Sequence, residues 1–429
     1  MLLPSLLLAF QSVAIPEAAK IIEARCLSCH QQGGIAPMAF HSSAAIRPWA
    51  KAMRQSILKG TMPPWHADAA SSEHLARVRA LTPNQKQTLL DWLTTDLDKQ
   101  PSFDLQAPAH PTGWQLGKPD LVLRIPNFPV PASGTVQYTF LVSKLNLPAD
   151  QWIAAAEWKI DQRQLVHHIN AFVRPQGSSY VKQAPVGELY VASREERAAR
   201  LPNEREIDRR ELLLGYEPGY LPQTWGEGRA KLIKAGSDMV FEIHYTANGK
   251  SASDSSELGI YFATSPPRER VLTISPADSN LNIPPGDPNY RSFVTATLLD
   301  DAKLVSLQPH MHLRGKAYEI AITPPNGPQS TLLRVPRYDF NWQTTYFLKE
   351  PLPLAKGTVI SCTAWFDNSP NNRFNPDPTK TILWGDQSWE EMNVGFMEIA
   401  IPANRDPDIV KLSGTTRPAG PSGADLLRR

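Results

Sequence analysis

Proline is the feature that most constrains how this chain folds. There are 40 prolines among 429 residues, about twice the average share of roughly 5%. Because proline disrupts helix interiors and is confined to strand edges and ends, this frequency favours a loop-rich β architecture. Between residues 119 and 402, short runs rich in β-branched and aromatic residues alternate with Pro, Gly and Asn, which predicts antiparallel sandwiches. The runs are 136–142, 169–173, 239–245, 303–307, 317–322 and 359–366.

Residues 15–100 have a different, helical pattern. We expect helices over 16–25 and 46–59, and a third that begins with Thr82 as N-cap and Pro83 in the first turn. The predicted fold class is therefore multidomain, with a small all-α domain followed by two all-β antiparallel sandwich domains. The predicted segments are a signal peptide (1–14), the α domain (15–100), a Pro-rich linker (101–118), the sandwiches (119–265 and 266–402) and a disordered tail (403–429). A charged insert at 193–211 is expected to be a surface helix without an assigned role.

The N-terminus predicts export to the periplasm or the extracellular space. Residues 2–10 are an apolar run too short to span a bilayer, and Ser12-Val13-Ala14 resembles a signal-peptidase site. No Lys or Arg precedes the run, so a misassigned start or an ordinary apolar helix stays open. No later stretch reaches the ~18 apolar residues of a membrane helix, and a net charge of +2 gives no reason to expect a nucleic-acid partner.

Two of the three cysteines stand in Cys26-Leu27-Ser28-Cys29-His30. Thiols at this spacing can add to both haem vinyl groups while the next histidine ligates the iron. A zinc or redox pair is the alternative, but the chain has no second cysteine pair to complete a zinc site. The motif therefore predicts one covalent haem c, which also requires export.

A methionine is the expected second axial ligand of that haem, with Met38, Met53 and Met62 as candidates. We favour Met62, because the prolines of Thr61-Met62-Pro63-Pro64-Trp65 stiffen a loop that must hold a weak thioether on iron. Met53 fits a buried helix face instead. A thioether ligand raises the haem potential, as suits an electron carrier. Over residues 15–100 the chain resembles a small class I cytochrome c, including Gly33-Gly34 and Ala36-Pro37 after the haem motif.

Five of the ten histidines gather at three places in the β region. Imidazole is the commonest protein ligand of copper and zinc. His310 and His312 would share one face of a strand, whereas His167 and His168 would point to opposite faces unless the strand bulges or ends there. A lone strand histidine is more often structural, but three groups, completed by His244, favour a metal site.

These residues resemble the copper type II, ascorbate-dependent monooxygenases, the family of peptidylglycine alpha-hydroxylating monooxygenase and dopamine beta-monooxygenase. That family has a His-His pair, a single His, a His-x-His and a Met in this chain order. The matching motifs are Leu165-Val166-His167-His168-Ile169, Glu242-Ile243-His244-Tyr245, Pro309-His310-Met311-His312-Leu313-Arg314-Gly315 and Glu390-Glu391-Met392-Asn393. The resemblance covers about residues 119–402. Met397 is the alternative to Met392 as the methionine ligand, but it lies in the apolar run 394–399, which predicts a core residue.

The resemblance implies jelly-roll-like sandwiches with two copper ions that face each other across an open, wet cleft. His167, His168 and His244 would hold the copper that stores and delivers an electron. His310, His312 and Met392 would hold the copper that binds O2 and would form the catalytic site. The implied oxidoreductase hydroxylates a C–H bond of a small organic substrate. Electrons would come from ascorbate or a redox protein, relayed through the fused haem.

Two departures narrow the resemblance. Cys362 is the only cysteine outside the haem motif. The sandwiches, which several disulfides stabilise in the animal enzymes, must therefore be stabilised here by packing alone. Gln308 stands two residues before His310, where the peptide-amidating enzyme has a carboxylate-binding arginine; it looks more like the catecholamine-hydroxylating branch. Two alternatives stay open: an electron-transfer or copper-binding haem protein without oxygenase activity, and a cytochrome fused to a sandwich that binds carbohydrate or another partner.

Overall fold

The computed structural model describes residues 16–32, 34–106, 113–193, 211–219, 221–405 and 407. The predicted signal peptide, nearly all of the charged insert and most of the C-terminal tail lie outside these residues. The chain forms two compact units, Met1–Trp65 with Arg79–His110, and His66–Val78 with Pro111–Arg429. The sequence predicts one domain over 15–100, whereas the structure assigns His66–Val78 to the second unit.

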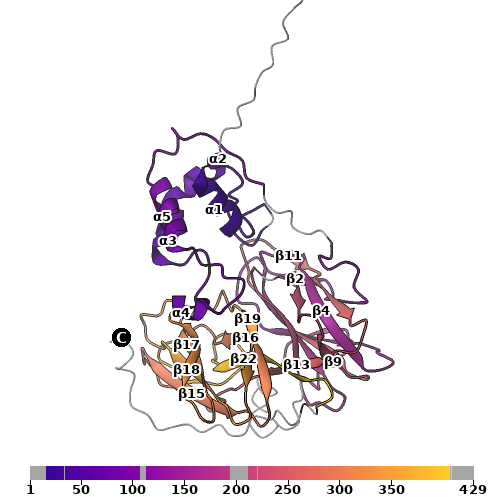
Figure 1. Cartoon of the computed structure of the whole chain (residues 1–429). Coiled ribbons are helices and arrows are strands. Elements are labelled where there is room, and N and C mark those ends of the chain that lie inside the picture. The colour runs from indigo at the N-terminus through magenta and orange to yellow at the C-terminus, as the bar shows by residue number, and fades with distance from the viewer. Residues whose placement is uncertain are drawn as a thin grey trace, which may run out of the picture. The chain divides into compact units, whose positions relative to one another are not determined.

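The first unit is built from short helices (Figure 1), which pack around an apolar core. Its helices are α1 (Glu17–Arg25), α2 (Ser43–Ile46), η1 (Arg47–Trp49), α3 (Ala50–Lys59) and α5 (Pro83–Trp92). The predicted helix start at Thr82 is confirmed: its side chain accepts a hydrogen bond from the Gln85 N–H, and the Gln85 side chain caps the Thr82 N–H in return. This capping box satisfies two N–H groups that the helix end leaves unpaired. Met53 and Ile57 form the buried face of α3, as predicted for Met53.

The second unit is mostly antiparallel β-sheet, as the sequence predicts (Figure 1). Its largest sheet is nine-stranded, in the order β1 (Leu121–Arg124), β12 (Glu257–Phe262), β4 (Gln151–Lys159), β9 (Arg229–Ile233), β13 (Glu269–Ile274), β22 (Val394–Pro402), β16 (Ala302–His310) and β19 (Tyr346–Leu354), with β8 (Gln223–Thr224) on β4. In the expected division, β9 belongs to the first sandwich and β13 to the second. Because these two strands pair, in parallel, the large sheet continues from one into the other.

Two further sheets complete the β layers. The five-stranded sheet has the order β6 (Leu189–Tyr190), β3 (Thr139–Lys144), β10 (Asp238–Tyr245), β5 (Val166–Arg174) and β7 (Glu211–Tyr216). The four-stranded sheet has the order β15 (Tyr290–Thr297), β20 (Val359–Phe366), β17 (Gly315–Thr323) and β18 (Ser330–Val335). Two small ladders pair β2 (Phe128–Val130) with β11 (Ala252–Asp254) and β14 (Asn282–Ile283) with β21 (Ile382–Leu383).

An apolar core holds the five-stranded sheet against the β1–β4 side of the large sheet. Leu141, Ile169 and Phe241 come from the five-stranded sheet, and Ile153 and Ile260 from the large one; all are at most 1% exposed and belong to one cluster. Alternate residues of each strand supply this core, as the period of a half-buried strand requires. Among the described residues, no helix is both long and apolar enough to cross a membrane.

The segment His66–Val78 packs along β18 and β19 of the second unit. The Asp68 N–H donates to the carbonyl of Arg334 (2.9 Å), and the Ala76 N–H donates to that of Phe347 (2.7 Å). The segment also accepts, since the Lys349 N–H donates to the His74 carbonyl (3.0 Å). The short helix α4 (Ala69–Ser72) within it is capped by the Asp68 side chain. Backbone pairing of this kind makes the segment an integral part of the second unit.

Candidate metal centre

Three histidines meet at the end of the paired strands β5 and β10. His168 lies opposite His244, but the next pair is Val166 with Tyr245. His167 is therefore the extra residue of a β-bulge, which turns it toward the side of its neighbours. The sequence predicts a bulge or strand end here if both adjacent histidines are to serve one ion, and the bulge is confirmed.

The geometry of this group suits a metal ion. One nitrogen from each of His167, His168 and His244 lies within 4.8 Å of the others. Nε2 of His167, Nε2 of His168 and Nδ1 of His244 are buried without a hydrogen-bond partner, although buried polar atoms normally have one. Burial lowers the pKa of His167 to about 4 and that of His244 to about 3. The imidazoles are therefore neutral at pH 7, which is the form that binds a metal.

His310 and His312 form a second pair, with ring centroids 5.1 Å apart and planes nearly perpendicular at 89°. Nδ1 of His310 lies 2.6 Å from Oε1 of Gln343, and Nδ1 of His312 lies 3.2 Å from the carbonyl of Glu390. Because both oxygens accept, each Nδ1 donates, and each Nε2 keeps its lone pair for a metal. Burial also lowers the pKa of His310 to about 4. Two neutral imidazoles are thus held in the tautomer that a metal site requires.

Glu391 joins the two segments that carry the candidate ligands His312 and Met392. Its carboxylate accepts hydrogen bonds from the N–H groups of His312 (2.8 Å) and Arg314 (2.6 Å), and Met392 is the next residue. Burial raises the pKa of Glu391 to about 8, while these donors and the Arg314 guanidinium lower it. These contacts only partly offset the effect of burial. Met397, in contrast, is 1% exposed and pairs with Leu307 inside the large sheet, which confirms it as core.

The two histidine groups lie close together in the second unit. Burial lowers the pKa of His168, and the other imidazoles of both groups, His310 and His312 included, lower it further. The ring of Phe340 lies 4.9 Å from that of His167 and 6.1 Å from that of His312, measured between centroids. The ring of Phe340, from the loop between β18 and β19, therefore lies where the resemblance implies an open, wet cleft.

Sequence reasoning missed Phe340, Gln343 and Glu391. The first two lie in a loop that follows the His310 motif by about 30 residues and carries no recognisable pattern. Only Glu391 had a signal, its position beside Met392. Tyr138 was missed as well; its ring stacks on His244 with centroids 4.6 Å apart.

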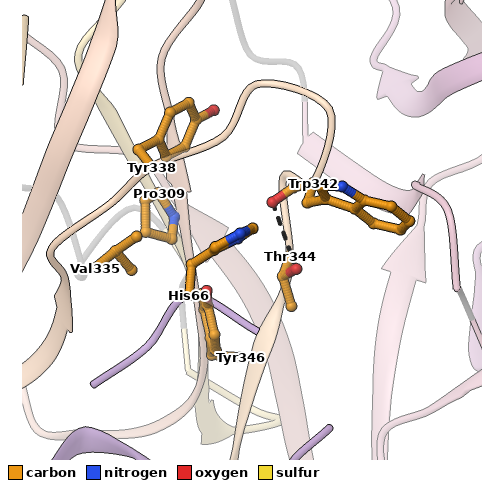
Figure 2. Close-up of a pocket in the computed structure, with 7 residues that line it drawn as sticks. All are labelled: His66, Pro309, Val335, Tyr338, Trp342, Thr344 and Tyr346. Atoms are coloured by element: carbon orange, nitrogen blue, oxygen red, sulfur yellow. Dashed lines mark hydrogen bonds between the residues drawn. The ribbon is translucent and has the colours of Figure 1, made fainter. Parts of the chain in front are cut away.

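A small pocket adjoins the second histidine pair, and Figure 2 shows its residues. It is lined by His66, Pro309, Val335, Tyr338, Trp342, Thr344 and Tyr346, with a cavity volume of about 10 Å³, which is room for about one water molecule. Nδ1 of His66 is buried there without a partner. Pro309 precedes His310, and the Tyr338 hydroxyl donates to the carbonyl of Met311 (2.8 Å). The segment His66–Val78 thus reaches the immediate neighbours of the candidate ligands.

The haem motif lies in the first unit, directly after α1. Cys26 and Cys29 are free thiols. Nδ1 of His30 lies 3.2 Å from the carbonyl of Met38 and donates to it, so Nε2 is left available to iron. The His30 ring stacks on Phe40, with centroids 4.2 Å apart, and burial lowers its pKa. A Cβ on Gly34 would lie 2.3 Å from the carbonyl oxygen of Cys29, so this approach requires glycine.

The three candidate methionines have different environments in the first unit. Met53 is 8% exposed in the helical core, and Met38 presents its carbonyl to His30. Met62 is half-buried in the loop after α3. Of the three, Met62 keeps the loop position that a second axial ligand would need, and its assignment stays a prediction.

Comparisons with known proteins identify no family. No family model and no curated protein matches the chain. Among solved structures, similarity is found to the infectious bursal disease virus Gx strain (12% identity, 66% of this chain, 60% of that chain, TM-score 0.18). The VP2 subviral particle of the same virus (12%, 65%, 59%, 0.17) and its Gt strain (11%, 68%, 72%, 0.19) are similar to the same degree. The chain thus spans about 60% of the first of these proteins. Such low TM-scores carry no argument about fold or function.

Proposed function

We propose that this protein is a copper-dependent monooxygenase fused to a c-type cytochrome domain, exported to the periplasm or beyond. The proposed reaction converts R–H, O2, two electrons and two protons to R–OH and water. Bound copper would supply the activation of O2 and the storage of single electrons, and bound haem would supply electron relay. The proposal includes an all-α cytochrome c fold for the helical domain and jelly-roll-like folds for the two sandwiches.

The observation that carries the proposal is the set of five neutral, largely buried imidazoles gathered at one place in the second unit. Three of their nitrogens, on His167, His168 and His244, are buried without partners. Burying an unpaired polar group costs about 1–3 kcal/mol, so three together favour a bound group that partners them, such as a metal ion. Histidines that served only packing, as in a carbohydrate-binding sandwich, would have their nitrogens paired within the protein.

The two groups are suited to different work. The all-histidine group offers ligands that serve both copper oxidation states, as one-electron storage needs. The second group adds the thioether of Met392, a soft ligand that favours Cu(I), the state that meets O2. Glu391 would keep Met392 beside His312, and Gln343 would fix the orientation of His310. Chemistry on the substrate therefore belongs to the second group.

The path of the chain supports electron delivery from the first unit. The chain passes between the units after Trp65, after Val78 and after His110. Three covalent connections keep the units at a higher effective concentration than one linker would. Met62, the proposed iron ligand, stands four residues before His66, which packs beside Pro309 and Tyr338. Only four positions of the sequence thus separate the proposed iron ligand from a residue beside the second histidine pair.

Oxygen uptake tests this function. The copper-loaded, reduced protein is mixed with fractions of a metabolite extract, and O2 consumption is followed with and without each fraction. We expect at least one fraction to raise uptake and to yield a product heavier by one oxygen atom. His312→Ala serves as the matched control, because it removes one ligand of the oxygen site and leaves the first histidine group intact. Copper binding and haem reduction without substrate-dependent uptake would identify an electron-transfer protein instead.

A further inference from the structure

The loop of residues 336–345, between β18 and β19, places one aromatic ring against both histidine groups. The ring of Phe340 stacks on that of His167 at 4.9 Å, with planes 24° apart. Its centroid lies 6.0 Å from His244 and 6.5 Å from His168. It also meets His312 of the second group edge-on at 6.1 Å. Four of the five candidate ligand histidines therefore contact one side chain from a loop.

The same loop makes the polar contacts that orient ligands on both sides. Oε1 of Gln343 accepts from His310 at 2.6 Å, and the Asn341 amide contacts His167. At the start of the loop, the Tyr338 hydroxyl holds the backbone of Met311. A displacement of the loop would therefore change the position of the Phe340 ring and the orientation of both histidine groups together.

We propose that Phe340 is the residue that controls access to the metal centre and sets the size of the molecule admitted. Its ring fills the space between the two groups, so a substrate must enter the space that the ring vacates. The ring is reached from solvent on one side, because Pro336, Arg337 and Asn341 of the loop are exposed and Phe340 itself is only half-buried. That the admitted molecule is a substrate rests on the proposed function. That Phe340 covers the histidines does not depend on it.

Chemical labelling of the metal-free full-length protein tests this role directly. Diethyl pyrocarbonate acylates neutral, accessible imidazoles, and peptide mapping by mass spectrometry resolves each histidine. An aromatic stacking contact can shift the equilibrium between covered and accessible histidines by up to about tenfold. We therefore expect His167 and His312 to be labelled about tenfold faster in Phe340→Ala than in wild type. His41, exposed in the first unit, is the internal standard and keeps its rate.

Two further variants make the outcome decisive. Phe374→Ala removes an exposed phenylalanine of the same unit (47% exposed) and should leave all labelling rates unchanged. Phe340→Leu preserves most of the side-chain volume and should give intermediate rates in a folded protein. Equal rates in wild type, Phe340→Leu and Phe340→Ala would overturn the proposal.

The outcomes separate this proposal from the proposed function. If the protein binds no copper, the monooxygenase assignment fails while the labelling result stands. If the protein takes up copper and uses O2 but Phe340→Ala labels like wild type, the control of access by Phe340 fails alone. A third measurement, the rate of copper removal by a chelator, should rise in Phe340→Ala by a similar factor.

Discussion

Replacing Glu391 with glutamine perturbs the contact on which the second ligand group depends. Glu391 is fully buried, and both of its oxygens accept backbone N–H groups, from His312 at 2.8 Å and from Arg314 at 2.6 Å. In Glu391→Gln one oxygen becomes an NH2 group, so one of these N–H groups loses its acceptor. Leaving a buried N–H group without an acceptor costs about 1–3 kcal/mol.

We therefore expect a loss of about 1–3 kcal/mol in the free energy of unfolding of the second unit. Denaturant unfolding of the metal-free protein, followed by tryptophan fluorescence, measures it. Glu350→Gln, on the exposed side of β19, is the matched control and should change stability by less than about 0.5 kcal/mol. The variant should also lose copper from the His310 and His312 pair and keep the other copper. A stability within about 0.5 kcal/mol of wild type, with full copper content, would refute this reasoning.

Three further predictions concern the haem and the effect of acid. One haem per chain should resist acid extraction, because thioether bonds to Cys26 and Cys29 survive denaturation; haem that extracts fully from a matured preparation contradicts this. Met62→Ala should lower the haem potential and leave copper content unchanged. Activity driven by a donor that reduces only haem should then fall, while activity with excess ascorbate is kept; equal losses would exclude a relay. Finally, the metal-free protein should lose stability as pH falls from about 6.5 toward 4 in urea titrations. In this range His310 binds a proton in the unfolded state but not in the folded state, because burial lowers its pKa to about 4. Each such histidine lowers the free energy of unfolding by about 1.4 kcal/mol per pH unit. A stability that does not depend on pH would contradict this prediction.

Local chemistry made part of this structure predictable from the sequence. The helix start at Thr82 and Pro83 follows from capping alone, and the bulge at His167 follows from the alternation of side chains along a strand. Met397 was assigned to the core because it stands in an apolar run, and it is buried in β22. Each of these features depends on residues within a few positions of one another.

Features that depend on distant pairing could not be predicted in the same way. Nothing local to His66–Val78 tells that its backbone pairs with β18 and β19 rather than with the helices that flank it in sequence. Leu75 is fully buried, but an apolar residue does not specify which core it joins. The closure of the metal centre depends likewise on Phe340, which reaches the histidines from a loop without a motif.

The central claim is that two groups of this chain's residues bind two copper ions, one of them with the thioether of Met392. Copper K-edge absorption with metal analysis, on the reduced protein and on Met392→Ile, tests it most directly. We predict two copper ions per wild-type chain and a sulfur scatterer in the reduced state. In Met392→Ile that scatterer should be absent, with weakened copper binding at His310 and His312, full binding at the other group and no hydroxylation. An unchanged sulfur signal in the variant would contradict this ligand assignment and point to Met311 or Met397, and a chain that binds no copper would contradict the account as a whole.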